Sequence, residues 1–170
     1  MKRSIVLIAG WGQTACACQP LLDALAGLAE VKLVLPRIPL ERVLDDITHQ
    51  VRAAMHTASA VLLLGWSLGG LLAIRWLTRQ SQAEPQGLPL CLLCVNPRFT
   101  ADAQWPGVPS AVFEAFAEQL DRDPESCLLR FQALQVKGDG DATKELKRLR
   151  RHCAEPAGGI DHATLAATLA

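Results

Sequence analysis

The hydrophobic positions follow two alternating patterns along the first 96 residues. Short, predominantly apolar runs cover 4–9, 31–35, 60–64 and 88–96. Between these runs, apolar residues recur every three or four positions over 20–28, 40–57 and 68–80. Uniformly apolar short runs are typical of strands covered on both faces, and the longer spacing is typical of amphipathic helices. The alternation therefore predicts an α/β fold, with a mostly parallel sheet flanked by helices.

The pattern changes after Asn96-Pro97. Pro106, Gly107 and Pro109 interrupt it, and helical spacing then returns over 111–120, 124–136 and 142–153, with a fourth helix expected near Asp161. No strand is predicted between these helices. We therefore expect residues 1–96 to form the amino-terminal part of a sheet-and-helix core, and residues 97–170 to form a helical cap (lid) over it.

Composition and charge exclude several classes of protein. Half of the 170 residues are hydrophobic, which suits a globular core. The 17 Lys and Arg balance the 17 Asp and Glu, so no overall field selects nucleic acid or an anionic membrane. No apolar stretch approaches 20 residues, and the amino-terminal run is broken by Gly10 and Gly12. We therefore expect a cytoplasmic protein with neither a membrane span nor a secretion signal.

The six cysteines lie at positions 16, 18, 91, 94, 127 and 153. Cys91 and Cys94 have the spacing of a metal or redox pair, but the residues of a strand alternate between its two faces, and no second Cys/His pair has the spacing of a zinc finger. Both lie in an apolar run, so we interpret them as small hydrophobic residues of the core. Free thiols of this kind favour the reducing cytoplasm.

A serine between two glycines joins the third apolar run to the helix that follows it. The stretch reads Gly65-Trp66-Ser67-Leu68-Gly69. Strand, sharp turn and helix form the context in which G-x-S-x-G is a nucleophile elbow, which exposes the serine hydroxyl. A side chain at either glycine would crowd the neighbouring strand or helix. The alternative is a glycine-rich turn without chemistry.

With this motif the chain resembles the α/β-hydrolases, and more closely the biotin-synthesis esterases that act on pimeloyl-[acyl-carrier protein] methyl ester. Five segments between positions 10 and 135 carry the resemblance. They are Gly10-Trp11-Gly12, Gly65-Trp66-Ser67-Leu68-Gly69-Gly70, Asn96-Pro97-Arg98-Phe99, Trp105-Pro106-Gly107 and Arg130-Phe131-Gln132-Ala133-Leu134-Gln135.

The resemblance implies a role for each matching residue. Ser67 would be the nucleophile, and the backbone amides of Trp11 and Leu68 would form the oxyanion hole. Trp11, Phe116 and Phe131 would bind the acyl chain of the substrate. The implied reaction is hydrolysis of a methyl ester on a dicarboxylic acyl chain, held as a thioester on acyl carrier protein. The resemblance implies no metal and no organic cofactor.

The chain departs from the family pattern at the catalytic base. In this fold the triad acid and base follow the serine on loops after later strands, but no strand is predicted after residue 96. The four histidines are His49, His56, His152 and His162, and none is expected to complete a triad; Asp161 and His162 are adjacent and so diverge. We therefore expect either the amino-terminal part of a longer esterase or a truncated product with little activity. A smaller departure is Ala9-Gly10 where many relatives have His-Gly.

A basic stripe lies on the helix predicted over 142–153. Lys144, Lys147, Arg148 and Arg151 fall at i, i+3, i+4 and i+7, which is one helical face. One interpretation is a solvated face. The other is a docking site for an acidic carrier protein, to which Arg130 would also contribute. Nucleic acid is a weaker hypothesis, because no recognised binding motif accompanies the stripe.

Two rival functions stay open at this point. The chain could be a hydrolase-like module that binds an acidic carrier protein without turnover. It could also be an esterase or thioesterase of the same fold that acts on small esters. The sequence does not indicate an oligomeric state.

Overall fold

The computed structural model describes residues 2–79, 87–153 and 162–169. The chain divides into two compact units, Met1–Asn96 and Pro97–Ala170. The first unit contains β1 (Arg3–Ile8), α1 (Ala15–Ala26), β2 (Glu30–Val34), α2 (Leu40–Thr57), β3 (Ala60–Trp66), α3 (Leu68–Arg79) and β4 (Leu90–Leu93). The second contains α4 (Ser110–Arg122), α5 (Pro124–Gln135), α6 (Ala142–Cys153) and α7 (His162–Leu169). That these units act as a hydrolase core and a cap stays a prediction.

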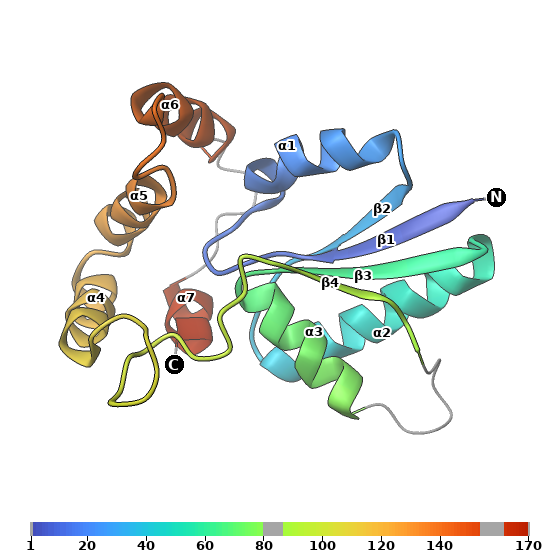
Figure 1. Ribbon diagram of the computed structural model, residues 1–170, viewed down its shortest axis with the longest axis horizontal. Coiled ribbons are helices and arrows are strands. Elements are labelled where there is room, and N and C mark those ends of the chain that lie inside the picture. Colours follow the sequence, from blue (N-terminus) through green and yellow to red (C-terminus); the bar gives the residue numbers. More distant parts are fainter. Residues whose placement is uncertain (1, 80–86, 154–161, 170) are drawn as a thin grey trace. The chain divides into compact units, whose positions relative to one another are not determined.

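The strands of the first unit form one parallel sheet in the order β2-β1-β3-β4 (Figure 1). β1 lies in its centre, where Leu7 is paired with Leu33 on one side and with Leu64 on the other. The predicted α/β fold with a parallel sheet is therefore confirmed.

Helices cover both faces of this sheet, α1 on one and α2 with α3 on the other (Figure 1). Successive residues of a strand point to opposite faces, so Val6 and Ile8 pack with α2 and α3, whereas Ile5 and Leu7 pack with leucines of α1. From Ser4 onward β1 is buried on both faces, which explains why Ile5 to Ile8 are all apolar.

The first helix begins earlier than the helix expected over 20–28. The side chain of Thr14 caps α1, because its Oγ1 accepts a hydrogen bond of 3.2 Å from the amide of Ala17. Pro20 therefore lies inside the helix and not at its start.

The last strand contradicts the expectation of a buried core strand over 88–96. β4 is shorter and lies at the edge of the sheet, paired only with β3. Cys91 and Cys94 are exposed, and Leu92 is 45% exposed. The interpretation of these two cysteines as core residues is therefore wrong. The physical reason is that β4 is an edge strand, and that α1, the helix on the face of the sheet where Cys91 is paired with Leu64, packs at the opposite end, against β2.

After a non-helical segment with one isolated bridge between Thr100 and Val108, the second unit consists of helices in its described residues, as expected from the sequence. α4 packs against α5 and α7, and α5 packs against α6. Asp123 separates α4 from α5 and caps the latter, accepting a hydrogen bond of 3.0 Å from the amide of Ser126. Leu120, Cys127 and Leu165 are the most buried apolar residues here. No helix in 2–79, 87–153 or 162–169 combines the length and the apolar character that crossing a membrane requires.

Candidate active site at the strand-to-helix turn

The strand order reverses next to β1. The chain runs from β1 outward to β2, and then crosses back to place β3 on the other side of β1. In open α/β sheets, ligands bind at the carboxyl ends of the strands where such a reversal occurs. Ile8 is paired with Gly65, so the ends of β1 and β3 lie side by side. The loop after β1 and the turn at Ser67 therefore share this position.

Ser67 is the single residue between β3 and α3, and its backbone is strained. Its φ is +54°, a conformation that residues other than glycine adopt rarely. The amide of Ser67 donates a hydrogen bond of 2.9 Å to the carbonyl of Leu93, and the carbonyl of Ser67 accepts one of 2.9 Å from Gly70. These bonds hold the bend between the neighbouring strand and the first turn of α3.

The two glycines of the motif are required by close packing. A Cβ on Gly69 would lie 2.1 Å from the carbonyl oxygen of Ile8, and a Cβ on Gly65 would lie 2.4 Å from the Cα of Gly70. Both contacts are with backbone, which cannot move aside. As the sequence predicts, a side chain at either position would crowd a strand or a helix.

The loop after β1 packs directly on the serine. A Cβ on Gly10 would lie 3.1 Å from the Cβ of Ser67 and 3.1 Å from the carbonyl oxygen of Trp66. The amide of Gln13 donates to the carbonyl of Gly10 at 3.3 Å, and Gly12 has a φ of +66°. This geometry is a type II turn with Trp11 and Gly12 at its centre. The roles of the Trp11 and Leu68 amides as oxyanion donors stay predictions.

Gln13 also belongs to this site, although the sequence did not indicate it. Its side-chain oxygen accepts a hydrogen bond of 2.7 Å from the amide of Gly10, and the residue is only 6% exposed. The signal in the sequence that could have indicated Gln13 is its position: a polar residue directly after Gly-Trp-Gly, which itself follows the apolar end of β1.

Within the described residues, no side chain that could act as a general base forms a hydrogen bond with Ser67. Ser67 is half-buried, and its hydroxyl has no hydrogen-bond partner there. His49 and His56 are exposed on α2, where the sequence also placed them. His162, on α7, lies 3.5 Å from a carboxylate oxygen of Asp121. Asp161 and the side chain of His152 lie outside the described residues.

The two phenylalanines expected to bind the acyl chain are neighbours in the second unit. Phe116 on α4 and Phe131 on α5 are half-buried, and their ring centroids are 6.3 Å apart. Their contact with substrate stays a prediction.

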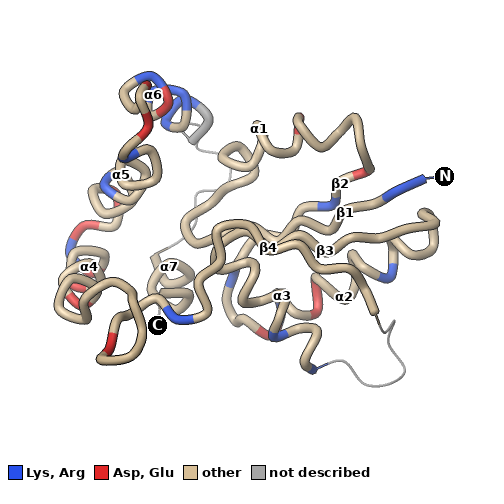
Figure 2. Tube along the Cα trace, viewed as in Figure 1, with Lys and Arg blue, Asp and Glu red and all other residues tan. Residues whose placement is uncertain are grey.

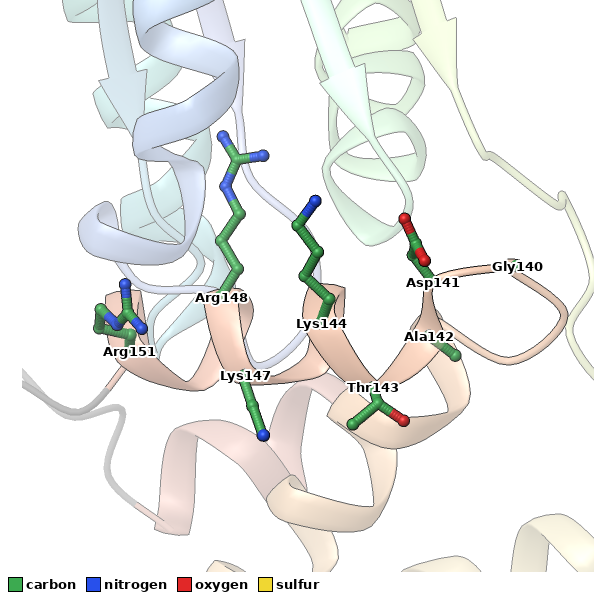
Figure 3. A pocket seen from close by; sticks show the side chains of 8 residues that line it. All are labelled: Gly140, Asp141, Ala142, Thr143, Lys144, Lys147, Arg148 and Arg151. Atoms are coloured by element: carbon green, nitrogen blue, oxygen red, sulfur yellow. The ribbon is translucent and has the colours of Figure 1, made fainter.

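The basic residues of α6 gather on one stretch of the second unit (Figure 2). Lys144, Lys147, Arg148 and Arg151 line a hollow of about 750 Å³, which also includes Gly140, Asp141, Ala142 and Thr143. The side chains of Lys144 and Arg148 extend to one side of α6, and that of Lys147 extends to the other side (Figure 3). Arg130 lies on α5, where its guanidinium donates a hydrogen bond of 2.9 Å to the side chain of Gln119. Carrier-protein docking at these residues stays a prediction.

No group of three or more His, Cys, Asp or Glu side chains capable of holding a metal ion occurs in the part of the chain that the structure describes.

Comparison with known proteins shows related esterases. The chain is 34% identical over 154 residues to the pimeloyl-[acyl-carrier protein] methyl ester esterase of Aliivibrio salmonicida, covering 86% of this chain and 57% of that protein. It is 34% identical over 168 residues to the enzyme of the same name from Stenotrophomonas maltophilia, covering 95% of this chain and 62% of that protein. The chain thus spans less than two thirds of the length of these relatives. No family model matches the sequence.

The fold is also that of a solved esterase. The esterase EaEST from Exiguobacterium antarcticum superposes with a TM-score of 0.69 over 98% of this chain and 65% of that one, at 16% identity. Identity at this level is evidence for the fold alone, whereas the sequence relatives carry the closer similarity. The resemblance stated from the sequence is therefore confirmed: the chain has the α/β-hydrolase fold and is a sequence relative of the pimeloyl-[acyl-carrier protein] methyl ester esterases over a part of their length.

Proposed function

We propose that this chain carries the nucleophile of a carboxylic ester hydrolase, and that Ser67 is that nucleophile. The observation that supports the proposal most is the φ of +54° at Ser67, between a parallel strand and a helix. Strained backbone of this kind persists only where the surrounding structure maintains it, and it clusters at functional sites. The position at the reversal of strand order supports the same conclusion.

The proposed chemistry is acyl transfer through the serine. The Oγ of Ser67 attacks the carbonyl carbon of the terminal ester, and the carbonyl electrons move onto the oxygen. The amides of Trp11 and Leu68 stabilise this oxyanion. The intermediate collapses, methoxide leaves and takes up a proton as methanol, and water then hydrolyses the acyl-enzyme. The serine proton must pass to a general base, which in this fold follows the serine in the chain.

The proposed substrate is a methyl ester on an acyl chain carried by acyl carrier protein. The names of the sequence relatives support this substrate. Carrier proteins are acidic, and the basic hollow on α6 has the complementary charge. Phe116 and Phe131 would contact the acyl chain, and Arg130 would extend the docking surface.

A second candidate is a module that binds the carrier protein without turnover. It is favoured by the observation that, among the described residues, no base contacts the hydroxyl of Ser67. Loss of triad members typically lowers turnover by about 10⁴ to 10⁶, so a serine without its base would be nearly inactive.

Replacing Ser67 by alanine separates these two candidates. If Ser67 is the nucleophile, ester hydrolysis disappears in Ser67→Ala while binding of the carrier protein, measured by calorimetry, is unchanged. If the chain only binds, the wild-type protein already shows no hydrolysis above the Ser67→Ala background. Equal rates on free methyl pimelate and on its carrier-protein thioester would instead favour an esterase of small esters.

Charge reversal tests the docking surface. We expect Lys144→Glu combined with Arg148→Glu to weaken carrier-protein binding by about tenfold or more, with the loss growing at low salt. Lys137→Glu is the matched control, because Lys137 is exposed in the same unit but does not line the hollow. Equal weakening by the control would contradict a local docking surface.

A further inference from the structure

We infer that Gln13 is a positioning residue. It fixes the loop after β1, which carries the Trp11 amide, against Ser67. This inference rests on the proposed function, because it concerns the amide of Trp11 as an oxyanion donor. It starts from the hydrogen bond of 2.7 Å that the Gly10 amide donates to the side-chain oxygen of Gln13, in a residue that is 6% exposed. A buried amide that lost this acceptor would lack a partner, which is costly.

Gln13 holds both peptide groups that flank Gly10. Its side chain accepts from the Gly10 amide, which belongs to the peptide between Ala9 and Gly10. Its own backbone amide donates to the Gly10 carbonyl at 3.3 Å, which belongs to the peptide between Gly10 and Trp11. One residue therefore closes the turn with two hydrogen bonds.

The second of these peptides carries the proposed oxyanion donor. In a trans peptide the C=O and N–H groups point in opposite directions, so fixing the Gly10 carbonyl also fixes the direction of the Trp11 N–H. The only cis peptide among the described residues is Ile38-Pro39, so the Gly10-Trp11 peptide is trans. The orientation of the Trp11 amide is thus set by Gln13.

The packing of Gly10 connects this turn to the nucleophile. A Cβ on Gly10 would lie 3.1 Å from the Cβ of Ser67, so the loop lies close to the serine and a side chain at position 10 would crowd it. On the other side, the Ala9 amide donates to the Val34 carbonyl at 3.0 Å and anchors the end of β1. The remaining freedom of the loop is rotation of its peptides, which the two bonds to Gln13 remove.

The test replaces Gln13 by leucine, which is similar in size but has no acceptor, and by glutamate, which keeps a carboxyl oxygen in place of the amide oxygen. Two quantities are measured on the full chain. One is hydrogen exchange of the Gly10 amide, which does not depend on activity. The other is the rate at which a fluorophosphonate probe phosphonylates Ser67, forming an Oγ–P bond with loss of fluoride and of the hydroxyl proton.

We expect Gln13→Leu to speed Gly10 exchange by about tenfold or more and to slow phosphonylation roughly 10- to 100-fold. We expect Gln13→Glu to keep the protection of the Gly10 amide. For substrate turnover, the loss should fall on kcat, with KM nearly unchanged, because the donor acts on the charge of the transition state. A merely structural role would not separate kcat from KM in this way.

Gln19→Leu is the matched control, because Gln19 is exposed on α1 and pairs only with Asp23 in the described residues. It should change neither quantity. Unchanged Gly10 exchange in Gln13→Leu overturns the role of Gln13. Faster exchange with an unchanged phosphonylation rate overturns its link to the oxyanion donor. Wild-type protein that is not phosphonylated at Ser67 overturns the proposed function, and the catalytic part of this inference with it.

Discussion

Ser67 and Cys94 share a backbone conformation that few side chains tolerate. Their φ angles are +54° and +52°, and each residue directly follows a strand of the sheet. A positive φ brings Cβ toward the backbone and costs on the order of 1–2 kcal/mol for a residue other than glycine. Glycine would remove this cost, so the serine at position 67 makes the fold less stable than a glycine there would.

The strain at Ser67 predicts a difference between two variants. Ser67→Gly should raise the free energy of unfolding by about 1 kcal/mol relative to Ser67→Ala, because both lack the hydroxyl but only alanine keeps the Cβ. Urea denaturation of the two variants measures the difference. Cys94→Gly and Cys94→Ala form a matched pair at a position with the same backbone, and should show a similar gap. Equal stabilities of the two Ser67 variants would show that the bend is not strained.

The cysteines differ in their expected reactivity. Burial raises the pKa of the Cys127 thiol, so less of the reactive thiolate is present at neutral pH. Cys18 is fully buried, whereas Cys91 and Cys94 are exposed. Iodoacetamide should therefore modify Cys91 and Cys94 first in the folded protein, as peptide mapping would reveal. In urea, where the protein is unfolded, the cysteines should react with iodoacetamide at similar rates. Early modification of Cys127 in the folded protein would contradict the described packing.

Met55 shows where residue spacing misleads. It follows Val43, Ile47 and Val51 at a spacing of four, which would place it with them on the apolar face of α2, but it is 44% exposed. A helix turns about 100° per residue, so a spacing of four advances about 40° at each step. After three steps Met55 has rotated away from Val43, and Ala54 takes the buried position.

At the level of elements, the bounds of α2 and α6 agree with the sequence, whereas those of α1 and β4 do not. α2 follows Pro39, a clear signal in the sequence for the start of a helix. The cap of α1 is the side chain of Thr14, an ordinary residue in a polar segment. β4 ends at Leu93 because Cys94 adopts a positive φ, a property of the folded backbone that no local pattern indicates.

The packing of the elbow predicts opposite effects for two glycine substitutions. Gly69→Ala should destabilise the protein by about 2–3 kcal/mol, because its Cβ would overlap the carbonyl oxygen of Ile8. Gly27→Ala is the control, since Gly27 ends α1 at a φ of −76° and a Cβ there would meet nothing within 4 Å. It should be neutral or stabilising by up to about 1 kcal/mol. Thermal unfolding of both variants tests the comparison, and similar effects would contradict it.

The loop before α4 predicts a dependence on pH. Asp102 accepts hydrogen bonds from the Gln104 and Trp105 amides, at 2.7 and 2.8 Å, and pairs with Arg98. The Gln104 amide foremost, with Arg98 and the Trp105 amide, holds the pKa of Asp102 below its ordinary value. A lowered pKa in the folded state stabilises the loop at neutral pH, and this contribution is lost as pH falls through the lowered pKa.

The variant that tests this pH dependence is Asp102→Ala. It should reduce protection of the Trp105 amide against hydrogen exchange at neutral pH, because the acceptor is gone. As pH falls through the lowered pKa of Asp102, protection of the Trp105 amide in the wild type should approach that in the variant. A difference between the two proteins that is constant with pH would show that the carboxylate charge does not stabilise the loop.

At the level of the whole molecule, equal numbers of basic and acidic residues conceal an uneven distribution. The 17 of each sign cancel over the chain, yet α6 carries five basic residues and one acidic residue. The overall count gives no reason to expect a nucleic-acid partner, whereas the docking surface proposed above rests on the local surplus. A balanced total charge is compatible with a basic surface, because a protein partner contacts one surface of the molecule and not its average charge.

The sequence indicates most of the proposed site and misses its supporting contacts. The elbow is recognisable because its chemistry and its backbone are encoded in five consecutive residues. Gln13 and the Leu93 carbonyl act through hydrogen bonds that only the folded chain brings together. The strained turn at Ser67 is part of that motif, and the folded chain adds the hydrogen bonds that hold it, from the Ser67 amide to Leu93 and from Gly70 to the Ser67 carbonyl.

Site-resolved mass spectrometry after reaction with a fluorophosphonate tests whether Ser67 is the nucleophile. We expect an adduct on the peptide that contains Ser67, none in Ser67→Ala, and none on the exposed serines 59 and 110. An adduct on those surface serines as fast as on Ser67, or no adduct on Ser67 at all, would contradict it.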